Sequence, residues 1–168
     1  ENKSITIKVT GNVITFTYTK RTDISYTVRY VDSEGNELST SKTVENKIFG
    51  EQVTENAITI NGYNVDEAAK SLKLTSGENV ITFTYTKRTD LSYTVRYIDE
   101  AGKEIKQAKV VGNQTFGAVV IVEVEQLEGY TTEETAKQIT IGLINEVTFT
   151  YKAREDLKVT IKYVDENG

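Results

Sequence analysis

The sequence predicts a mainly β protein built from small modules repeated in tandem. The first observation is an internal repeat, because residues 12–30 and 79–97 are identical at 18 of 19 positions and begin 67 residues apart. The second is the alternation of Ile14, Phe16 and Tyr18 with threonines, which is the period of two expected of half-buried strands. The third is the abundance of β-branched and aromatic residues in both copies, since these residue types favour strands.

Five strands are expected in each repeat, and the first two form a hairpin. In the first complete repeat the expected strands are 25–32, 37–45, 57–61, 71–75 and 79–87, with matching strands one repeat later. Asp32-Ser-Glu-Gly35 predicts a type I turn followed by a glycine with positive φ,. Residues 51–61 could be helical alone, but their copy 118–128 is rich in Val and Ile. Both segments are therefore expected to be extended.

One short helix per repeat is expected after the Gly-Tyr pair. Asn64-Val-Asp-Glu67 and Thr131-Thr-Glu-Glu134 both fit a capping box ahead of Ala-Lys, and allow one or two helical turns. The tyrosines of the alternating segments, Tyr18 included, share a face with Ile14, Phe16 or Val28 and are expected to pack in a core,. The predicted core of the first repeat comprises Tyr26, Val28, Tyr30, Phe49, Ile58, Ile60, Tyr63, Leu72, Leu74, Ile81, Phe83 and Tyr85.

The repeat divides the chain into four parts. Residues 24–90 and 91–156 are two complete units, 1–23 match the C-terminal part of a preceding repeat, and 157–168 match the start of a following one. The Lys-Arg-Thr-Asp connector at 87–90 contains no Pro, so it is not a polyproline spacer. Modules joined by such short connectors are expected to form an elongated, monomeric rod.

Composition excludes most catalytic chemistry. The 168 residues include no His, Cys, Met, Trp or Pro, so imidazole bases, thiolates, disulfides and the usual zinc ligands are absent. A net charge of −5 argues against a nucleic-acid partner,. No apolar run reaches the length of about 18 residues needed for membrane insertion. Neither a G-x-S-x-G nor an S-x-x-K motif is present, and we do not expect an enzyme.

Two groups of polar residues could carry special chemistry or have only structural roles. The Asp-x-x-Gly turns, with Glu34, Glu37, Glu100 and Glu104 nearby, offer oxygen ligands for calcium, but too few are in register and solvated turns are preferred,. An intramodule isopeptide bond needs a Lys, an Asn and an acid. The available sets are Lys70, Asn79 and Glu67, and Lys137, Asn145 and Glu134. Surface positions in polar loops are the preferred interpretation, and no metal or cofactor is expected.

The order and spacing of several marks resemble a known repeat. Val28-Arg-Tyr-Val-Asp32-x-x-Gly35-Asn-Glu-Leu38 is followed by Gly50, then Gly62-Tyr63, then Val80-Ile-Thr-Phe-Thr-Tyr85, and the second unit repeats these marks from Val95 to Tyr151. This pattern resembles the MucBP repeat, the mucin-binding-protein module of Gram-positive surface proteins. The resemblance implies a β-grasp-like module, whose first and last strands lie parallel and adjacent, in a secreted, extracellular, cell-wall-attached protein. It supplies no catalytic residue.

The resemblance implies adhesion, and three functions stay open. The leading one is multivalent, non-covalent binding of mucin or another host glycoprotein. A structural stalk that projects a separate adhesive or enzymatic domain is the alternative, and an accessory module that docks a hydrolase on its substrate is the third. If glycans bind, the expected contacts are Tyr63, Tyr130, Asn61, Asn64, Thr131 and Thr132. Without His, binding is expected to be flat between pH 5 and 8.

Overall fold

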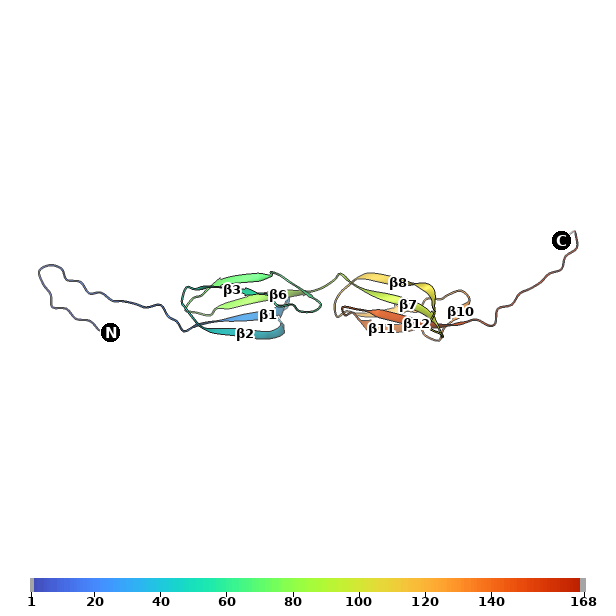
Figure 1. Ribbon diagram of the computed structural model, residues 1–168, viewed down its shortest axis with the longest axis horizontal. Coiled ribbons are helices and arrows are strands. Elements are labelled where there is room, and N and C mark those ends of the chain that lie inside the picture. Colours follow the sequence, from blue (N-terminus) through green and yellow to red (C-terminus); the bar gives the residue numbers. More distant parts are fainter. Residues whose placement is uncertain (1, 167–168) are drawn as a thin grey trace. The chain divides into compact units, whose positions relative to one another are not determined.

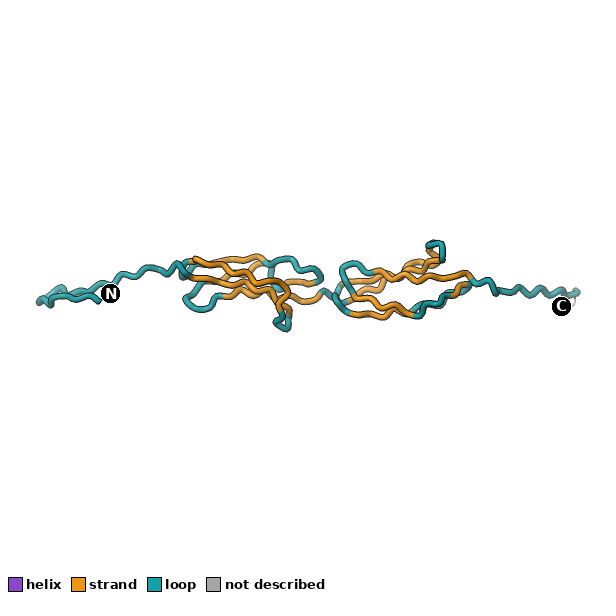
Figure 2. The backbone as a smooth tube through the Cα atoms, turned by 90° about the horizontal axis from the view of Figure 1, so that it is seen from below, coloured by secondary structure: helices purple, strands orange, loops and turns teal. Residues whose placement is uncertain are grey.

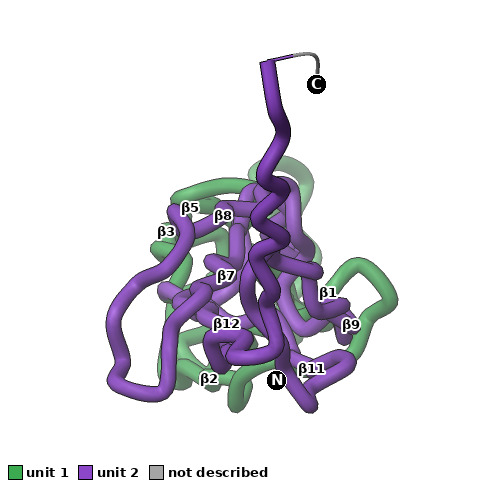
Figure 3. The backbone as a smooth tube through the Cα atoms, turned by 90° about the vertical axis from the view of Figure 1, so that its right-hand side faces the viewer, with its two compact units in different colours: residues 1–58, 65–84 green, residues 59–64, 85–168 purple. Residues whose placement is uncertain are grey.

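The computed structural model describes residues 2–166 and divides the chain into two compact units. The first contains residues 1–58 and 65–84, and the second contains residues 59–64 and 85–168 (Figure 3). The boundary between the units therefore does not coincide with a repeat boundary, because a short loop of the first repeat belongs to the second unit.

The first repeat contains six strands. They are β1 (Ile24–Asp32), β2 (Glu37–Lys47), β3 (Gln52–Asn56), β4 (Tyr63–Val65), β5 (Ala69–Lys73) and β6 (Val80–Lys87). Four of them form a sheet in the order β2-β1-β6-β4, and β3 pairs antiparallel with β5 in a separate two-stranded sheet. Figure 1 labels β1, β2, β3 and β6 of this repeat.

The second repeat has the same six-strand plan. Its strands are β7 (Leu91–Asp99), β8 (Glu104–Gln114), β9 (Val119–Glu123), β10 (Tyr130–Thr131), β11 (Ala136–Thr140) and β12 (Glu146–Ala153). The sheet order is β10-β12-β7-β8, and β9 pairs antiparallel with β11. Strands β7 and β12 are parallel neighbours, from Thr94 opposite Glu146 to Asp99 opposite Tyr151. The predicted β-grasp-like adjacency of first and last strands is confirmed.

The connector between the repeats leads from one sheet to another, as predicted. Strand β6 lies in the sheet of β1 and β4, whereas β7 lies in the sheet of β8 and β12. The hairpin predicted at Asp32 is also confirmed: β1 pairs antiparallel with β2, and Gly35 has φ +88°. One carboxylate oxygen of Asp32 accepts the amides of Glu34 (2.9 Å) and Asn36 (2.8 Å), which closes the turn.

Two strand positions were predicted imperfectly. The copies 51–61 and 118–128 are extended, as expected. In the first copy the strand lies at 52–56, so the strand expected at 57–61 is wrong. The next strand begins at Ala69, two residues before the expected range. Strands β3 and β5 pair along five residues from Gln52 opposite Lys73 to Asn56 opposite Ala69. This pairing fixes both positions, and the local pattern of apolar residues does not contain it.

The predicted helix after Gly-Tyr is wrong. The residues that fit a capping box instead enter the sheet, because β4 ends at Val65 and the amide of Asp66 donates to the carbonyl oxygen of Thr84 (2.9 Å). A hydrogen bond to a neighbouring strand thus takes the place of a helical one. Within residues 2–166 the structure contains no helix, and so none with the length and apolarity that a membrane span requires.

Alternating strand residues form the core of each repeat. Phe83 and Phe149 are completely buried, and Phe83 stacks on Tyr30 with ring centroids 6.0 Å apart. The predicted residues that are buried are Tyr26, Val28, Tyr30, Leu74, Ile81, Phe83 and Tyr85, while Ile24, Val31 and Val53 were missed. Ile60, Tyr63 and Leu72 are half-buried. Phe49 and Ile58 are exposed, so their core assignment is wrong; both lie in loops beyond the strands that alternate across the sheet.

Residues 12–20 form no strand although their sequence matches that of β6 (Figure 2). The expected burial of Ile14, Phe16 and Tyr18 is wrong, and the Tyr18 side chain is 86% exposed. Strand β6 has β1 and β4 as hydrogen-bonded neighbours, whereas residues 12–20 have no such neighbours. An unpaired segment has nothing against which to bury its apolar face.

Candidate functional site

The Gly-Tyr pairs occupy the same kind of turn in both repeats. Gly62 and Gly129 have φ of +83° and +79°, a conformation that favours glycine over other residues. The amide of the following tyrosine closes each turn, donating from Tyr63 to the carbonyl oxygen of Ile60 (3.2 Å) and from Tyr130 to that of Leu127 (3.1 Å). Each tyrosine then begins a short edge strand, and both side chains are half-buried.

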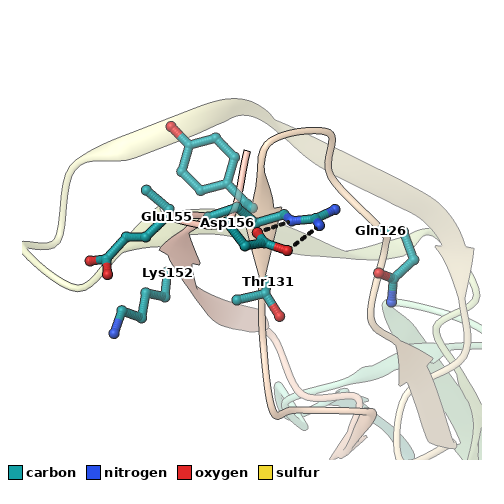
Figure 4. A pocket seen from close by; sticks show the side chains of 8 residues that line it. Gln126, Thr131, Lys152, Glu155 and Asp156 are labelled. Carbon is teal, nitrogen blue, oxygen red and sulfur yellow. Dashed lines mark hydrogen bonds and ion pairs between the residues drawn. The ribbon is translucent and has the colours of Figure 1, made fainter. Parts of the chain in front are cut away.

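In the second repeat, Tyr130 lines a hollow of about 530 Å³ (Figure 4). The other lining residues are Gln126, Thr131, Lys152, Ala153, Arg154, Glu155 and Asp156. Arg154 makes two hydrogen bonds to Asp156, of 2.8 and 2.6 Å. These bonds lower the pKa of the Asp156 carboxyl and raise that of the Arg154 guanidinium. The pair is therefore a fixed, mutually neutralising part of the wall, and Tyr130 supplies an aromatic ring.

Thr131 and Thr132 directly follow Tyr130 in the sequence, and of the two only Thr131 lines the same hollow. The Thr131 side chain is exposed, and both threonines line a second hollow of about 370 Å³. The hydroxyl of Thr132 donates to the carbonyl oxygen of Thr150 (2.8 Å) and accepts the amide of Glu134 (3.2 Å). Thr131 is consequently the freer of the two hydroxyls for an external hydrogen bond.

In the first repeat, Tyr63 already has an aromatic partner. Within the second compact unit, Phe116 packs edge-on against the Tyr63 ring, with centroids 5.7 Å apart and planes at 63°. The amide of Arg88 donates to the carbonyl oxygen of Gly62 (2.9 Å), and that of Phe116 to the carbonyl oxygen of Arg88 (2.8 Å). Asn61 and Asn64 are exposed. The two asparagines are thus accessible, while part of the tyrosine ring is covered.

Sequence reasoning missed the residues that surround the two tyrosines. Gln126, Lys152 and Arg154 line the hollow at Tyr130, and Phe116 covers part of Tyr63. One usable signal was the Arg-x-Asp pattern of the connectors, which recurs at Arg21, Arg88 and Arg154. The Phe-Gly pairs at 49–50 and 116–117 were a second signal, but Phe49 was interpreted as a core residue.

In each set of residues considered for an isopeptide bond, the lysine lies near the acid, with Lys137–Glu134 at 3.0 Å and Lys70–Glu67 at 3.9 Å, but the side chains also have other partners. The ammonium group of Lys70 donates to a carboxylate oxygen of Asp66 (2.5 Å) and to the carbonyl oxygen of Thr82 (2.7 Å). The side-chain amide of Asn79 donates to the carbonyl oxygens of Ser25, Thr75 and Gly77. The second repeat has the same hydrogen bonds: Lys137 donates to the carbonyl oxygen of Thr148, and the side-chain amide of Asn145 donates to that of Ser92. The asparagines therefore brace a loop against the first strand of each repeat. The surface position expected for Asn79 is wrong, because its side chain is buried by these contacts.

The Asp-x-x-Gly carboxylates serve the hairpin turns. Asp99 accepts the amides of Ala101 (3.0 Å) and Lys103 (2.8 Å), as Asp32 does at the corresponding turn. Hydrogen bonds from the turn keep the pKa of Asp32 below its ordinary value. Among residues 2–166, no group of three or more acidic side chains is placed to hold a metal ion.

Among curated proteins, the chain is similar to internalins of Listeria monocytogenes. It is 32% identical to internalin I over 145 residues, which is 79% of this chain and 8% of that protein. It is 27% identical to internalin J over 180 residues, which is 100% of this chain and 19% of that protein. The chain therefore spans only a small part of the relatives it matches.

The chain also matches solved structures of bacterial proteins, at low identity and low TM-score. The type 2 repeat of the mucus binding protein MUB from Lactobacillus reuteri is 13% identical, with a TM-score of 0.30 over 78% of this chain and 100% of that chain. The Bacillus anthracis TIE protein is 15% identical, with a TM-score of 0.49 over 79% of this chain and 34% of that chain.

A family model matches each repeat separately. The MucBP domain matches residues 26–86 and again residues 93–152. These two segments include every strand from β1 to β12 apart from a few terminal residues. The chain therefore belongs to the MucBP domain family and contains two of its domains in tandem.

Proposed function

We propose that the two repeats are part of the adhesive region of a bacterial surface protein and bind mucin or another host glycoprotein non-covalently. The protein is extracellular and attached to the cell wall of a Gram-positive bacterium. The observation that supports this proposal is the tandem MucBP match, with the same turn presenting Tyr63 in one repeat and Tyr130 in the next. Repetition of one weak site raises avidity without any new contact.

The proposed contacts combine aromatic rings with polar side chains. Tyr130 and the exposed Thr131 lie at the hollow of the second repeat, with Thr132 adjacent, and the exposed Asn61 and Asn64 flank Tyr63. An amphipathic ring can stack on a sugar, while amide and hydroxyl groups satisfy its hydroxyls. No catalytic residue, metal or cofactor is part of the proposal, because such recognition needs none of them.

Glycan binding of this kind should not depend on pH near neutrality. Among the described residues, every carboxyl with a shifted pKa shifts downward, as Asp156 and Glu125 do through hydrogen bonds from Arg154 and Lys106. The shifted groups therefore remain ionised between pH 5 and 8, and the chain has no His to titrate there,.

A structural stalk is the second candidate function. The observation that favours it is the contact between Tyr63 and Phe116, because it gives the Gly-Tyr turn a packing role that requires no ligand. On this proposal the repeats project a separate adhesive or enzymatic domain, and the exposed polar residues only keep the array soluble.

Binding to a mucin-coated surface as a function of repeat number separates the two proposals. We expect a six-repeat chain to bind far more tightly than the two-repeat chain, since avidity can exceed single-site affinity by about 10²–10⁴-fold. Absence of binding at either length would contradict adhesion and support the stalk.

Substitution of single side chains then tests the contacts. Thr131→Ala and Asn64→Ala remove exposed polar groups and should weaken binding at an unchanged melting temperature. Ser33→Ala, at the exposed tip of the first hairpin, is the matched control and should bind normally. Tyr130→Ala is informative only where its melting temperature is unchanged, because a drop of several degrees identifies the ring as a packing residue.

A further inference from the structure

The Gly-Tyr turn of one repeat and the Phe-Gly loop of another form two halves of a junction. Within the second compact unit both halves are present: Phe116 lies against Gly62 and Tyr63. Elsewhere in the chain each half stands alone. Phe49 occupies the position equivalent to Phe116 and is 42% exposed, and Tyr130 occupies the position equivalent to Tyr63 beside an open hollow.

Each half keeps its own backbone hydrogen bond without the other half. The amide of Phe49 donates to the carbonyl oxygen of Arg21 (2.9 Å), as that of Phe116 does to Arg88 (2.8 Å). On the other half, the amide of Arg154 donates to the carbonyl oxygen of Gly129 (2.9 Å), as that of Arg88 does to Gly62. The Phe49 loop and the Gly129-Tyr130 turn therefore each make, without a partner half, the backbone hydrogen bond that the same element makes in the complete junction.

The connector arginine is the residue that both halves share. Arg21, Arg88 and Arg154 each form a two-pronged hydrogen bond to the aspartate two residues later. The same pairing is made at all three places, whether or not a junction is complete. In the complete junction, Arg88 links the two halves, because its amide donates to the carbonyl oxygen of Gly62 and its carbonyl oxygen accepts the amide of Phe116.

Backbone conformation favours glycine at both turns, but lack of space excludes a side chain only where the junction is complete. A Cβ added at Gly62 would lie 2.4 Å from a ring carbon of Phe116, which is too close for any side chain. A Cβ added at Gly129 would meet no atom within 4 Å, although φ is nearly the same at both positions. The space that the Phe116 ring fills beside Gly62 is open beside Gly129.

We propose that the hollow lined by Tyr130, Lys152 and Arg154 is a docking site for the Phe-Gly loop of another copy of this repeat. The phenyl ring would lie over Gly129 and edge-on to Tyr130, as Phe116 lies over Gly62 and beside Tyr63. By the same reasoning, the exposed Phe49 fits the Gly-Tyr turn of a further copy. Docking is favoured when the copies share one chain, because a tether raises the local concentration of the second half.

This inference is independent of glycan binding, and its test needs no glycan. A three-repeat chain is made by replacing residues 157–168 with a second copy of 91–156. Gly62→Ala and Gly129→Ala are compared by melting temperature in the two-repeat and three-repeat chains. Both substitutions meet the same strain at positive φ, so the difference between them reports the phenylalanine contact.

In the two-repeat chain, Gly62→Ala should lower the melting temperature by about 4 °C or more beyond Gly129→Ala. In the three-repeat chain, Gly129→Ala should become as damaging as Gly62→Ala. A Gly129→Ala effect that is equal in chains of both lengths would overturn the proposal.

A second comparison holds even where one glycine variant fails to fold. Phe116→Ala removes the ring atoms that a Cβ at Gly62 would meet, so in this background Gly62→Ala should cost no more than Gly129→Ala. Amide exchange gives an independent readout, with Phe49 as the reference for a lone half because its amide has the same hydrogen bond but its ring is exposed. The Phe amide of the added repeat should exchange as slowly as that of Phe116 and more slowly than that of Phe49. Fast exchange at the added Phe, with slow exchange at Phe116, would show that the second junction does not form.

Discussion

At the residue scale, two buried tyrosines are held by carboxylates that also bind lysines. Tyr26 donates its phenolic hydrogen to Glu55 (2.6 Å), which also accepts Lys42. Tyr97 donates to Glu125 (3.1 Å), which also pairs with Lys106. The two triads are not equivalent positions of the repeat, since Tyr97 aligns with Tyr30 and not with Tyr26. A buried tyrosine hydroxyl therefore has a carboxylate partner in each repeat, but the two pairs lie at different positions of the repeat.

These tyrosines should make the protein sensitive to alkali. Burial, followed by the hydrogen bond to a carboxylate, raises the pKa of Tyr26 and of Tyr97 to about 12, from about 10. Because the pKa of each tyrosine is higher in the folded protein than in the unfolded chain, its protonated hydroxyl stabilises the fold fully below pH 10. This stabilisation is lost as the pH rises toward 12. We expect about 1.4 kcal/mol less unfolding free energy per tyrosine at pH 11 than at pH 8.

Urea unfolding at these two pH values measures the effect, with Tyr26→Phe and Tyr97→Phe as controls for other titrating groups. The phenylalanine variants should lose less stability between pH 8 and 11 than the parent. Equal losses in parent and variants would show that neither hydroxyl titrates abnormally.

At the element scale, identical sequences adopt different structures. Residues 12–20 and 79–87 share one sequence, yet only the second forms a strand. Phe16 is 51% exposed and Phe83 is completely buried. The difference is the presence of β1 and β4 beside β6, so the strand depends on its neighbours more than on its own residues.

A matched pair of substitutions measures this dependence. Phe83→Ala removes a buried ring and should cost about 3–5 kcal/mol of unfolding free energy. Phe16→Ala alters the same local sequence and should stay within about 0.5 kcal/mol of the parent. Urea unfolding of the two variants makes the comparison, and a large effect of Phe16→Ala would show that residues 12–20 are packed in solution.

The same dependence explains which elements the sequence predicts. The hairpin at Asp32 and the long strands follow from local turn chemistry and alternation, and both are found. The helix at Asn64 was wrong because a hydrogen bond to the neighbouring strand overrides a capping box,. At the candidate site, the turn at Tyr63 was visible as Gly-Tyr. Its contact with Phe116 joins residues 53 positions apart, which no local pattern contains.

At the scale of the whole molecule, sequence repeats and compact units are not the same objects. The loop 59–64 belongs to the first repeat by sequence and to the second compact unit by its contacts. A unit of this size buries only about 60% of the surface that its unfolded chain exposes. A few additional contacts with a neighbouring repeat therefore matter more here than in a large domain.

The segments on either side of the two repeats should contribute nothing to this stability. Residues 2–20 and 157–166 contain no strand or helix, and their apolar side chains are largely exposed, with Val9 and Tyr163 among the most accessible. A chain limited to residues 21–156 keeps every strand and retains Arg21, whose carbonyl oxygen accepts the amide of Phe49. Its unfolding free energy should lie within about 0.5 kcal/mol of the parent value, because exposed side chains that leave no cavity cost little to remove. Thermal and urea unfolding of the two chains provide the measurement, and a loss of several degrees in the shorter chain would mean that the flanking segments pack against the repeats.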